Sequence, residues 1–180
     1  MTIRRAAGTL SFPADFILIS AMNPCPCGYR GDPTKECRCS SSAIDRYQKR
    51  LSGPLLDRID IHVEAPRVEY EKLSASTTGE RSGAIRERVE AARSVQRRRF
   101  GEGSTVQNGT MGLGDIRRHC PLDDASAGLV RSAMRQLNLS ARAYHRVLKL
   151  GRTIADLADS EDIRPAHIAE AIQYRRRETN

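Results

Sequence analysis

Four of the chain's five cysteines lie close together in the sequence. They form two C-x-C pairs, Cys25 with Cys27 and Cys37 with Cys39, and nine residues separate the two pairs. Four thiolates that converge on one ion at about 2.3 Å make the tetrahedral site typical of structural zinc. The C-x-C spacing is less diagnostic than C-x-x-C, so clustered free thiols or a redox pair remain the alternatives. We expect these four cysteines to bind a structural Zn²⁺ ion.

Arginine supplies most of the chain's positive charge. The 180 residues include 30 Lys and Arg, of which 26 are Arg, against 22 Asp and Glu, and the formal net charge is +8. Because the planar guanidinium binds phosphate with two parallel hydrogen bonds, this composition favours a nucleotide or nucleic-acid partner. A solvated arginine-rich surface is the alternative interpretation.

The sequence contains no feature of a membrane or secreted protein. No apolar run approaches the ~18 residues of a membrane span. The N-terminus lacks the apolar segment of a signal peptide. We therefore expect a cytoplasmic chain without a membrane partner, whose cysteines stay reduced unless they bind a metal.

The first half of the chain has the pattern of an α/β layer. Residues 16–19 form a continuous apolar run, which predicts a strand buried on both faces. Residues 59–64 alternate with period two and predict a second strand. Between them, residues 24–42 have no periodic pattern and indicate an irregular insertion, and residues 43–51 favour a short helix.

The second half has the pattern of a helical bundle. A helix is expected from Ser82, followed by a flexible linker or loose hairpin at 101–114, which contains five glycines. Helical spacing of apolar residues then predicts a helix over about 123–137. Two further helices are expected, one with Ser140 as its N-cap and one beginning near Pro165.

Four short stretches resemble a known family. They are AMNPCPCGY at 21–29, GPLLDRID at 53–60, SARAYHRVL at 140–148 and RTIADL at 152–157. Together they resemble the C-terminal part of an AAA+ ATPase of the bacterial magnesium-chelatase-like family. The branch they resemble is the competence-related one, whose full-length proteins also carry a Lon-like N-terminal domain.

The resemblance implies a fold class of α/β followed by all-α. Residues 1–100 would be the C-terminal part of the AAA+ P-loop NTPase core, with its last strands and a zinc-binding insertion at 24–42. Residues 101–114 would be a glycine-rich linker. Residues 115–180 would form a helical lid similar to the magnesium chelatase C-terminal domain.

Three further residues acquire roles from the resemblance. Asn23, which follows the first expected strand, resembles sensor 1, which orients the attacking water; the alternative is an Asn-Pro turn. Arg58 resembles the arginine finger, and the alternative is a surface arginine paired with Asp57 or Asp60. Arg142 resembles sensor 2, which contacts the γ-phosphate of ATP from the lid; the alternative is a solvated surface arginine.

Two motifs of the family are missing from this chain, the phosphate loop and the paired acidic residues of the Walker B strand end. No G-x-x-x-x-G-K-[ST] phosphate loop occurs, since no glycine is followed by lysine. We therefore expect this chain to be inactive alone. In the full-length protein it would contribute to the hydrolysis of ATP with Mg²⁺ at the subunit interfaces of a homo-oligomeric ring, expected to be a hexamer acting on DNA. The alternative function is a stand-alone, zinc-stabilised nucleic-acid-binding module.

Overall fold

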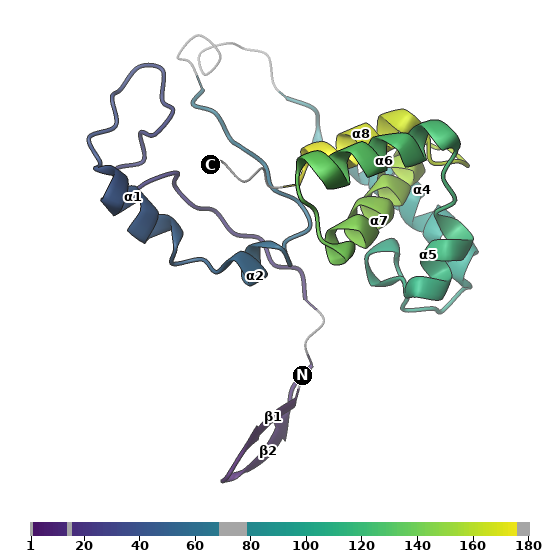
Figure 1. Ribbon diagram of the computed structural model, residues 1–180. Helices are drawn as coiled ribbons and strands as arrows, with labels where there is room; N and C mark the ends of the chain where they lie inside the picture. Colours follow the sequence, from purple (N-terminus) through teal and green to yellow (C-terminus); the bar gives the residue numbers. More distant parts are fainter. Residues whose placement is uncertain (1, 14–15, 69–78, 176–180) are drawn as a thin grey trace. The chain divides into compact units, whose positions relative to one another are not determined.

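The computed structural model describes residues 2–13, 16–68 and 79–175 (Figure 1). The chain divides into two compact units, Met1–Arg50 and Leu51–Asn180. Among the described residues, no helix has both the length and the apolar character needed to cross a membrane.

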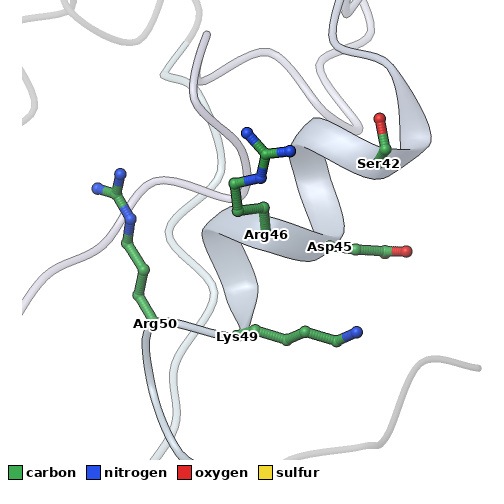
Figure 2. Close-up of a pocket in the computed structure, with 5 residues that line it drawn as sticks. All are labelled: Ser42, Asp45, Arg46, Lys49 and Arg50. Atoms are coloured by element: carbon green, nitrogen blue, oxygen red, sulfur yellow. The ribbon is translucent and has the colours of Figure 1, made fainter.

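The first unit combines a small hairpin, the cysteine-containing loop and one helix. Strands β1 (Thr2–Arg5) and β2 (Gly8–Ser11) pair antiparallel. Helix α1 (Ser41–Gln48) begins directly after the last cysteine of the loop, and the Ser40 hydroxyl accepts a hydrogen bond from the Ala43 backbone N–H as its N-cap. The side chains of Arg46, on this helix, and of Lys49, directly after it, are exposed (Figure 2).

The two strands expected at 16–19 and 59–64 are not formed. Phe16 to Ile19 have exposed fractions between 58% and 89%. A strand is held by hydrogen bonds to a neighbouring strand, and none of the described residues pairs with either segment in that way. The His62 backbone N–H instead donates to the Tyr174 carbonyl at 2.9 Å. The expected α/β layer is therefore absent from the described residues, although the helical part forms as expected.

The second unit is a helical bundle preceded by one short helix (Figure 1). Its described elements are α2 (Gly53–Leu56), α4 (Ser82–Phe100), the 3₁₀ turn η1 (Asn108–Thr110), α5 (Leu113–His119), α6 (Asp124–Gln136), α7 (Ala141–Leu157) and α8 (Pro165–Gln173). The helices expected from Ser82, over 123–137, after Ser140 and from Pro165 are all confirmed.

Helix α7 forms the centre of the bundle and contacts α4, α5, α8 and η1. Its buried face includes Val147, Leu148 and Ala155, each no more than 3% exposed. Gly151 brings α7 close to α8, since a Cβ atom there would lie only 2.9 Å from Ile168 Cδ1. The bundle core is thus a tightly packed aliphatic contact around α7.

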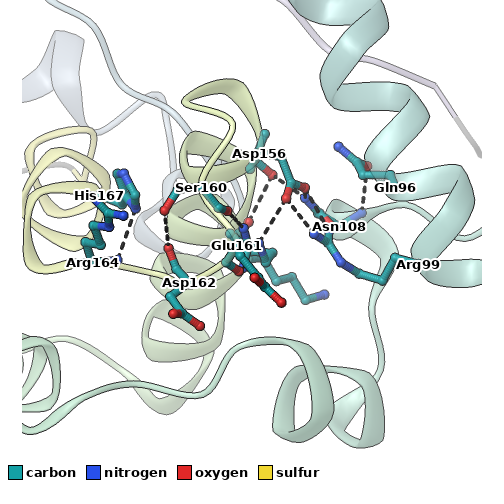
Figure 3. Close-up of polar contacts among 12 residues, drawn as sticks. Gln96, Arg99, Asn108, Asp156, Ser160, Glu161, Asp162, Arg164 and His167 are labelled. Carbon is teal, nitrogen blue, oxygen red and sulfur yellow. Dashed lines mark hydrogen bonds and ion pairs between the residues drawn. The ribbon is translucent and has the colours of Figure 1, made fainter.

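A buried polar network joins α4 and η1 to α7 (Figure 3). Arg99 donates to both carboxylate oxygens of Asp156, at 2.7 and 2.5 Å. Arg152 Nε and Asn108 Nδ2 donate to the same carboxylate, at 3.0 and 2.7 Å. The glycine-rich stretch 101–114 is therefore anchored at Asn108, which is only 1% exposed, rather than loose along its whole length.

Candidate functional site

The four cysteine side chains expected to bind a metal converge in the first unit. Their sulfur atoms all lie within 4.8 Å of one another. Cys25 Sγ lies 3.4 Å from Cys27 Sγ and 3.6 Å from Cys37 Sγ, and the sulfurs of Cys27 and Cys37 are also 3.6 Å apart. In a tetrahedral site with Zn–S bonds of about 2.3 Å, neighbouring sulfurs are about 3.8 Å apart. This cysteine cluster (Cys25, Cys27, Cys37 and Cys39) can therefore hold a metal ion with little rearrangement.

The cysteines converge because the loop turns tightly between the two C-x-C pairs. The Gly28 backbone N–H donates to the Cys25 carbonyl at 3.0 Å. Gly28 and Gly31 both have a φ of +82°, a conformation that glycine adopts without strain. Cys25 is fully buried, while the other three cysteines are partly exposed and none is in a disulfide. Four converging free thiols fit a metal site better than a two-cysteine redox pair.

The thiols of the cluster influence one another's ionisation. Burial raises the pKa of Cys25, but hydrogen bonds from Cys27, the Arg30 backbone N–H and Cys37 outweigh it and lower that pKa to about 6. The hydrogen bond with Cys27 raises the pKa of Cys39 to about 12. One thiolate therefore forms readily at neutral pH, whereas ionising all four requires a cation among them.

Arg58 follows α2 and has no acidic partner among the described residues. Its side chain is exposed, and Nη1 donates to the Pro54 carbonyl at 2.8 Å. The two neighbouring carboxylates contact other arginines. Asp57 lies 3.5 Å from Arg175, and Asp60 pairs with Arg146. The simple alternative, in which Arg58 is neutralised by Asp57 or Asp60, is therefore not what the structure contains.

The backbone around Arg58 is fixed to the bundle by two arginines. Arg146 Nη1 on α7 donates to the Arg58 carbonyl at 2.5 Å. Arg175 Nη1, beyond the end of α8, donates to the Ile59 carbonyl at 3.0 Å. Arg175 is 5% exposed, and this burial lowers its pKa. Sequence reasoning missed both anchors, because a single sequence does not distinguish an arginine that packs against a carbonyl from one that is solvated.

Arg142 lies in the first turn of α7, one turn before Arg146. Its side chain is exposed and forms no hydrogen bond or ion pair with the described residues. The Ser140 hydroxyl accepts from the Ala143 N–H and caps the helix, and no acidic residue lies in the first turn. A cation there opposes the helix dipole, a small cost that a bound anion would offset.

Asn23 belongs to the first unit, whereas Arg58 and Arg142 belong to the second. Asn23 is exposed, and a Cβ atom at Gly28 would lie 3.8 Å from its side chain. The expected sensor-1 residue therefore lies beside the turn of the cysteine cluster. Within the second unit, helix α7 carries Arg142 and also contacts the backbone of Arg58.

Comparison with known proteins accounts for nearly the whole chain. Residues 1–73 match the family described as magnesium chelatase, subunit ChlI, and residues 79–175 match its C-terminal domain. Competence protein ComM of Haemophilus influenzae is 42% identical over 175 residues, and an uncharacterized protein of Escherichia coli, YifB, is 38% identical over 175. Each alignment covers 96% of this chain but 33% of the relative, so the chain spans about a third of their length. The chain belongs to the magnesium chelatase ChlI family.

Proposed function

We propose that this chain is the C-terminal part of a magnesium-chelatase-like AAA+ ATPase. The full-length protein would hydrolyse ATP with Mg²⁺ in a homo-oligomeric ring, expected to be a hexamer, and act on DNA. Family membership supports the ATPase assignment. The name of the Haemophilus relative, which describes that protein as a competence protein, supports a role in DNA uptake or recombination. Residues 1–100 would complete the α/β core, and the bundle would form the lid.

The assignment of Arg58 as the arginine finger depends on one observation above all. Its guanidinium has no carboxylate partner among the described residues, although Asp57 and Asp60 are its close neighbours in sequence. Arg146 holds its carbonyl and Arg175 holds that of Ile59, while the Arg58 side chain stays exposed. A fixed backbone and an available guanidinium suit a group that reaches a neighbouring subunit's site. There it would neutralise charge on the transferring phosphoryl group, an effect of about 10³–10⁵ in rate.

Two other residues would complete this site. Arg142 would contact the γ-phosphate of ATP from the lid, and its exposed, unpaired position in the first turn of α7 leaves it available. The Asn23 amide both donates and accepts hydrogen bonds, so it can orient an attacking water. Because this chain has no phosphate loop, tight nucleotide binding would depend on the rest of the protein.

The cysteine cluster would hold a structural Zn²⁺ ion. The sulfurs of Cys25, Cys27 and Cys37 lie 3.4–3.6 Å apart, and all four cysteine sulfurs lie within 4.8 Å of one another, which suits a tetrahedral four-thiolate site. The ion would fix the loop from Cys25 to Cys39 and, through Ser40, the start of α1. It has no place in the proposed hydrolysis, because four protein ligands leave no open coordination position.

Replacement of Arg58 in the full-length protein tests this proposal. Arg58→Ala should lower ATP turnover by about 10³-fold or more while nucleotide affinity is retained. Arg58→Lys should recover little, since an ammonium does not reproduce the planar guanidinium. Arg131→Ala removes another exposed arginine, on α6, and serves as the matched control. Turnover by Arg58→Ala within about tenfold of the control would show that the assignment is wrong.

A second function has separate support from the first unit. The cysteine cluster and the unpaired cations beside it also suit a zinc-stabilised module that binds nucleic acid without ATP. Under this alternative, the chain would bind DNA with a steep salt dependence, and the full-length protein would show no ATP turnover.

A further inference from the structure

The cations of the cysteine-containing part of the chain are unpaired. Six lie between residues 24 and 50, and none forms an ion pair with the residues that the structure describes. They are Arg30, Lys35, Arg38, Arg46, Lys49 and Arg50. In the second unit, some arginines on α4 and α7 do pair with carboxylates such as Asp156 and Asp60, although Arg58 and Arg142 do not pair with any that the structure describes. The first unit therefore has positive charge available for an external partner.

Part of this charge is needed by the cysteine cluster itself. Four thiolates on Zn²⁺ leave two surplus negative charges. Arg30, Lys35 and Arg38 lie in the same loop as the ligands and can balance them. The Lys35 ammonium also lies 4.1 Å from the centre of the Tyr29 ring. These three loop cations would thus serve to balance the charge of the metal-bound cluster.

The three cations at the end of α1 and in the two residues after it are not explained in this way. Arg46, Lys49 and Arg50 come seven or more residues after the last cysteine. With Ser42 and Asp45 they line a pocket of about 460 Å³, and all five residues are exposed (Figure 2). Figure 2 shows Arg46 and Arg50 extending on one side of the helix and Lys49 on another. Three cations against one acid leave a positive surface, which we call the α1 surface.

We propose that the α1 surface binds the phosphate backbone of a nucleic acid through Arg46, Lys49 and Arg50. Arg46 lies in the last turn of α1, and Lys49 and Arg50 directly follow the helix. Successive phosphates of one DNA strand are about 3.4 Å apart along the helix axis, so cations this close in the chain can contact neighbouring phosphates. No aromatic residue lines the pocket, so binding is independent of base sequence. This inference rests on the proposed function only in taking DNA as the substrate.

The other side of α1 favours nucleic acid over a lipid surface. Ala43, Ile44 and Tyr47 are half-buried, so α1 has no free apolar face beside its cations. A helix that binds the membrane surface inserts such a face. The cluster also precedes α1 directly, so bound metal would hold the start of the helix and limit the entropy lost on binding.

The test is a salt titration of DNA binding by the metal-loaded 180-residue chain. Fluorescence anisotropy with a short labelled duplex, and separately a single strand, gives the slope of log affinity against log salt. Combined Arg46→Gln, Lys49→Gln and Arg50→Gln should lower the duplex slope by about 2.7, since each phosphate contact contributes about 0.9. A slope of this size corresponds to about a 40-fold fall in DNA affinity between ~50 and ~200 mM salt. The variant should not show this part of the salt dependence.

A matched control removes the same charge from another helix. Combined Arg86→Gln, Arg93→Gln and Arg98→Gln on α4 should change the slope by less than about 1. The α1 variant must retain its metal and helical circular dichroism, and Arg46→Lys, Arg50→Lys should restore the slope because the charge returns. If the triple α1 variant loses its metal, the three substitutions are tested one at a time. Each should then lower the slope by about 0.9.

Three results would overturn the inference. One is a slope unchanged by the α1 substitutions while DNA binding persists, which would leave the proposed function intact. Another is α1-dependent binding to anionic phospholipid vesicles or an acidic polypeptide without binding to DNA. The third is absence of DNA binding by both this chain and the full-length protein, which would also remove DNA from the proposed function. ATP turnover that depends on Arg58 is measured separately and is unaffected by the first two.

Discussion

Removal of the buried carboxylate of Asp156 should destabilise the helical bundle strongly. Its side chain is 0% exposed and accepts hydrogen bonds from Arg99, Arg152 and Asn108. The Arg99 and Arg152 side chains are only 12% and 4% exposed. Asp156→Asn preserves the volume of the side chain but leaves two guanidinium charges largely buried without their anion.

The expected cost follows from that uncompensated charge. Removing one partner of a buried ion pair typically costs about 3–5 kcal/mol. That is a large fraction of the ~5–15 kcal/mol that stabilises a typical domain. The exposed pair between Arg88 and Glu80, with side chains 54% and 44% exposed, offers the comparison. Its loss through Glu80→Gln should cost far less, because water screens the exposed charges.

Urea unfolding followed by helical circular dichroism measures both effects in the same chain. Asp156→Asn should lower the free energy of unfolding by about 3–5 kcal/mol, and Glu80→Gln should lower it only slightly. Equal losses in the two variants would refute the reasoning, because burial would then make no difference to the value of the carboxylate. Arg152 also binds the carbonyls of Ser160 and Glu161, so those contacts should loosen with the network.

Three other predictions concern the metal, pH and packing. Metal analysis should give about one zinc per chain. Cys37→Ser should lose the zinc and Cys120→Ser should retain it. Equal zinc contents in the two variants would exclude the proposed ligand set. Burial, Arg152 and Arg164 lower the pKa of His167 from 6.5, and the pKa of His119 is lowered as well. The neutral histidines should therefore contribute their full stabilisation above pH 6.5, and the free energy of urea unfolding should fall as the pH drops towards the folded-state pKa. An unfolding free energy that does not change with pH in this range would contradict the prediction. Gly151→Val should cost about 1–3 kcal/mol against Ile168, whereas Gly128→Ala, with open space around it, should stabilise the chain by about 0.5–1 kcal/mol.

The helical half was predictable because its signals are local. Ser140 as an N-cap and Pro165 in a first helical turn lie where capping preferences place them. Apolar spacing then identifies the face of each helix that packs inward. Such signals need no information about distant parts of the chain.

The strands expected at 16–19 and 59–64 failed for a reason that is equally physical. An apolar run indicates that a segment favours burial, but a strand also needs a hydrogen-bonding neighbour. None of the described residues supplies one, and Ile17 and Ile19 remain more than 80% exposed. The sequence therefore indicates what these residues could do beside a sheet, not what they do in this chain.

The sequence identifies which residues belong to the candidate site, but it does not predict the contacts that they make. The spacing of the cysteines indicated a metal site, and the four sulfurs do converge. The pairing of Asp57 with Arg175 and of Asp60 with Arg146 joins residues more than 80 positions apart. Local patterns do not encode such contacts. These contacts occupy Asp57 and Asp60, and they therefore decide whether Arg58 has a carboxylate partner.

We propose above all that Arg58 acts on the ATP site of a neighbouring subunit. The decisive measurement mixes two inactive full-length proteins, one carrying Arg58→Ala and one with its phosphate loop disabled. A subunit with an intact loop can then lie beside one with an intact Arg58, so the mixture should regain ATP turnover. If each protein is inactive alone and the mixture remains inactive although mixed rings assemble, Arg58 does not act across a subunit interface and the account is wrong.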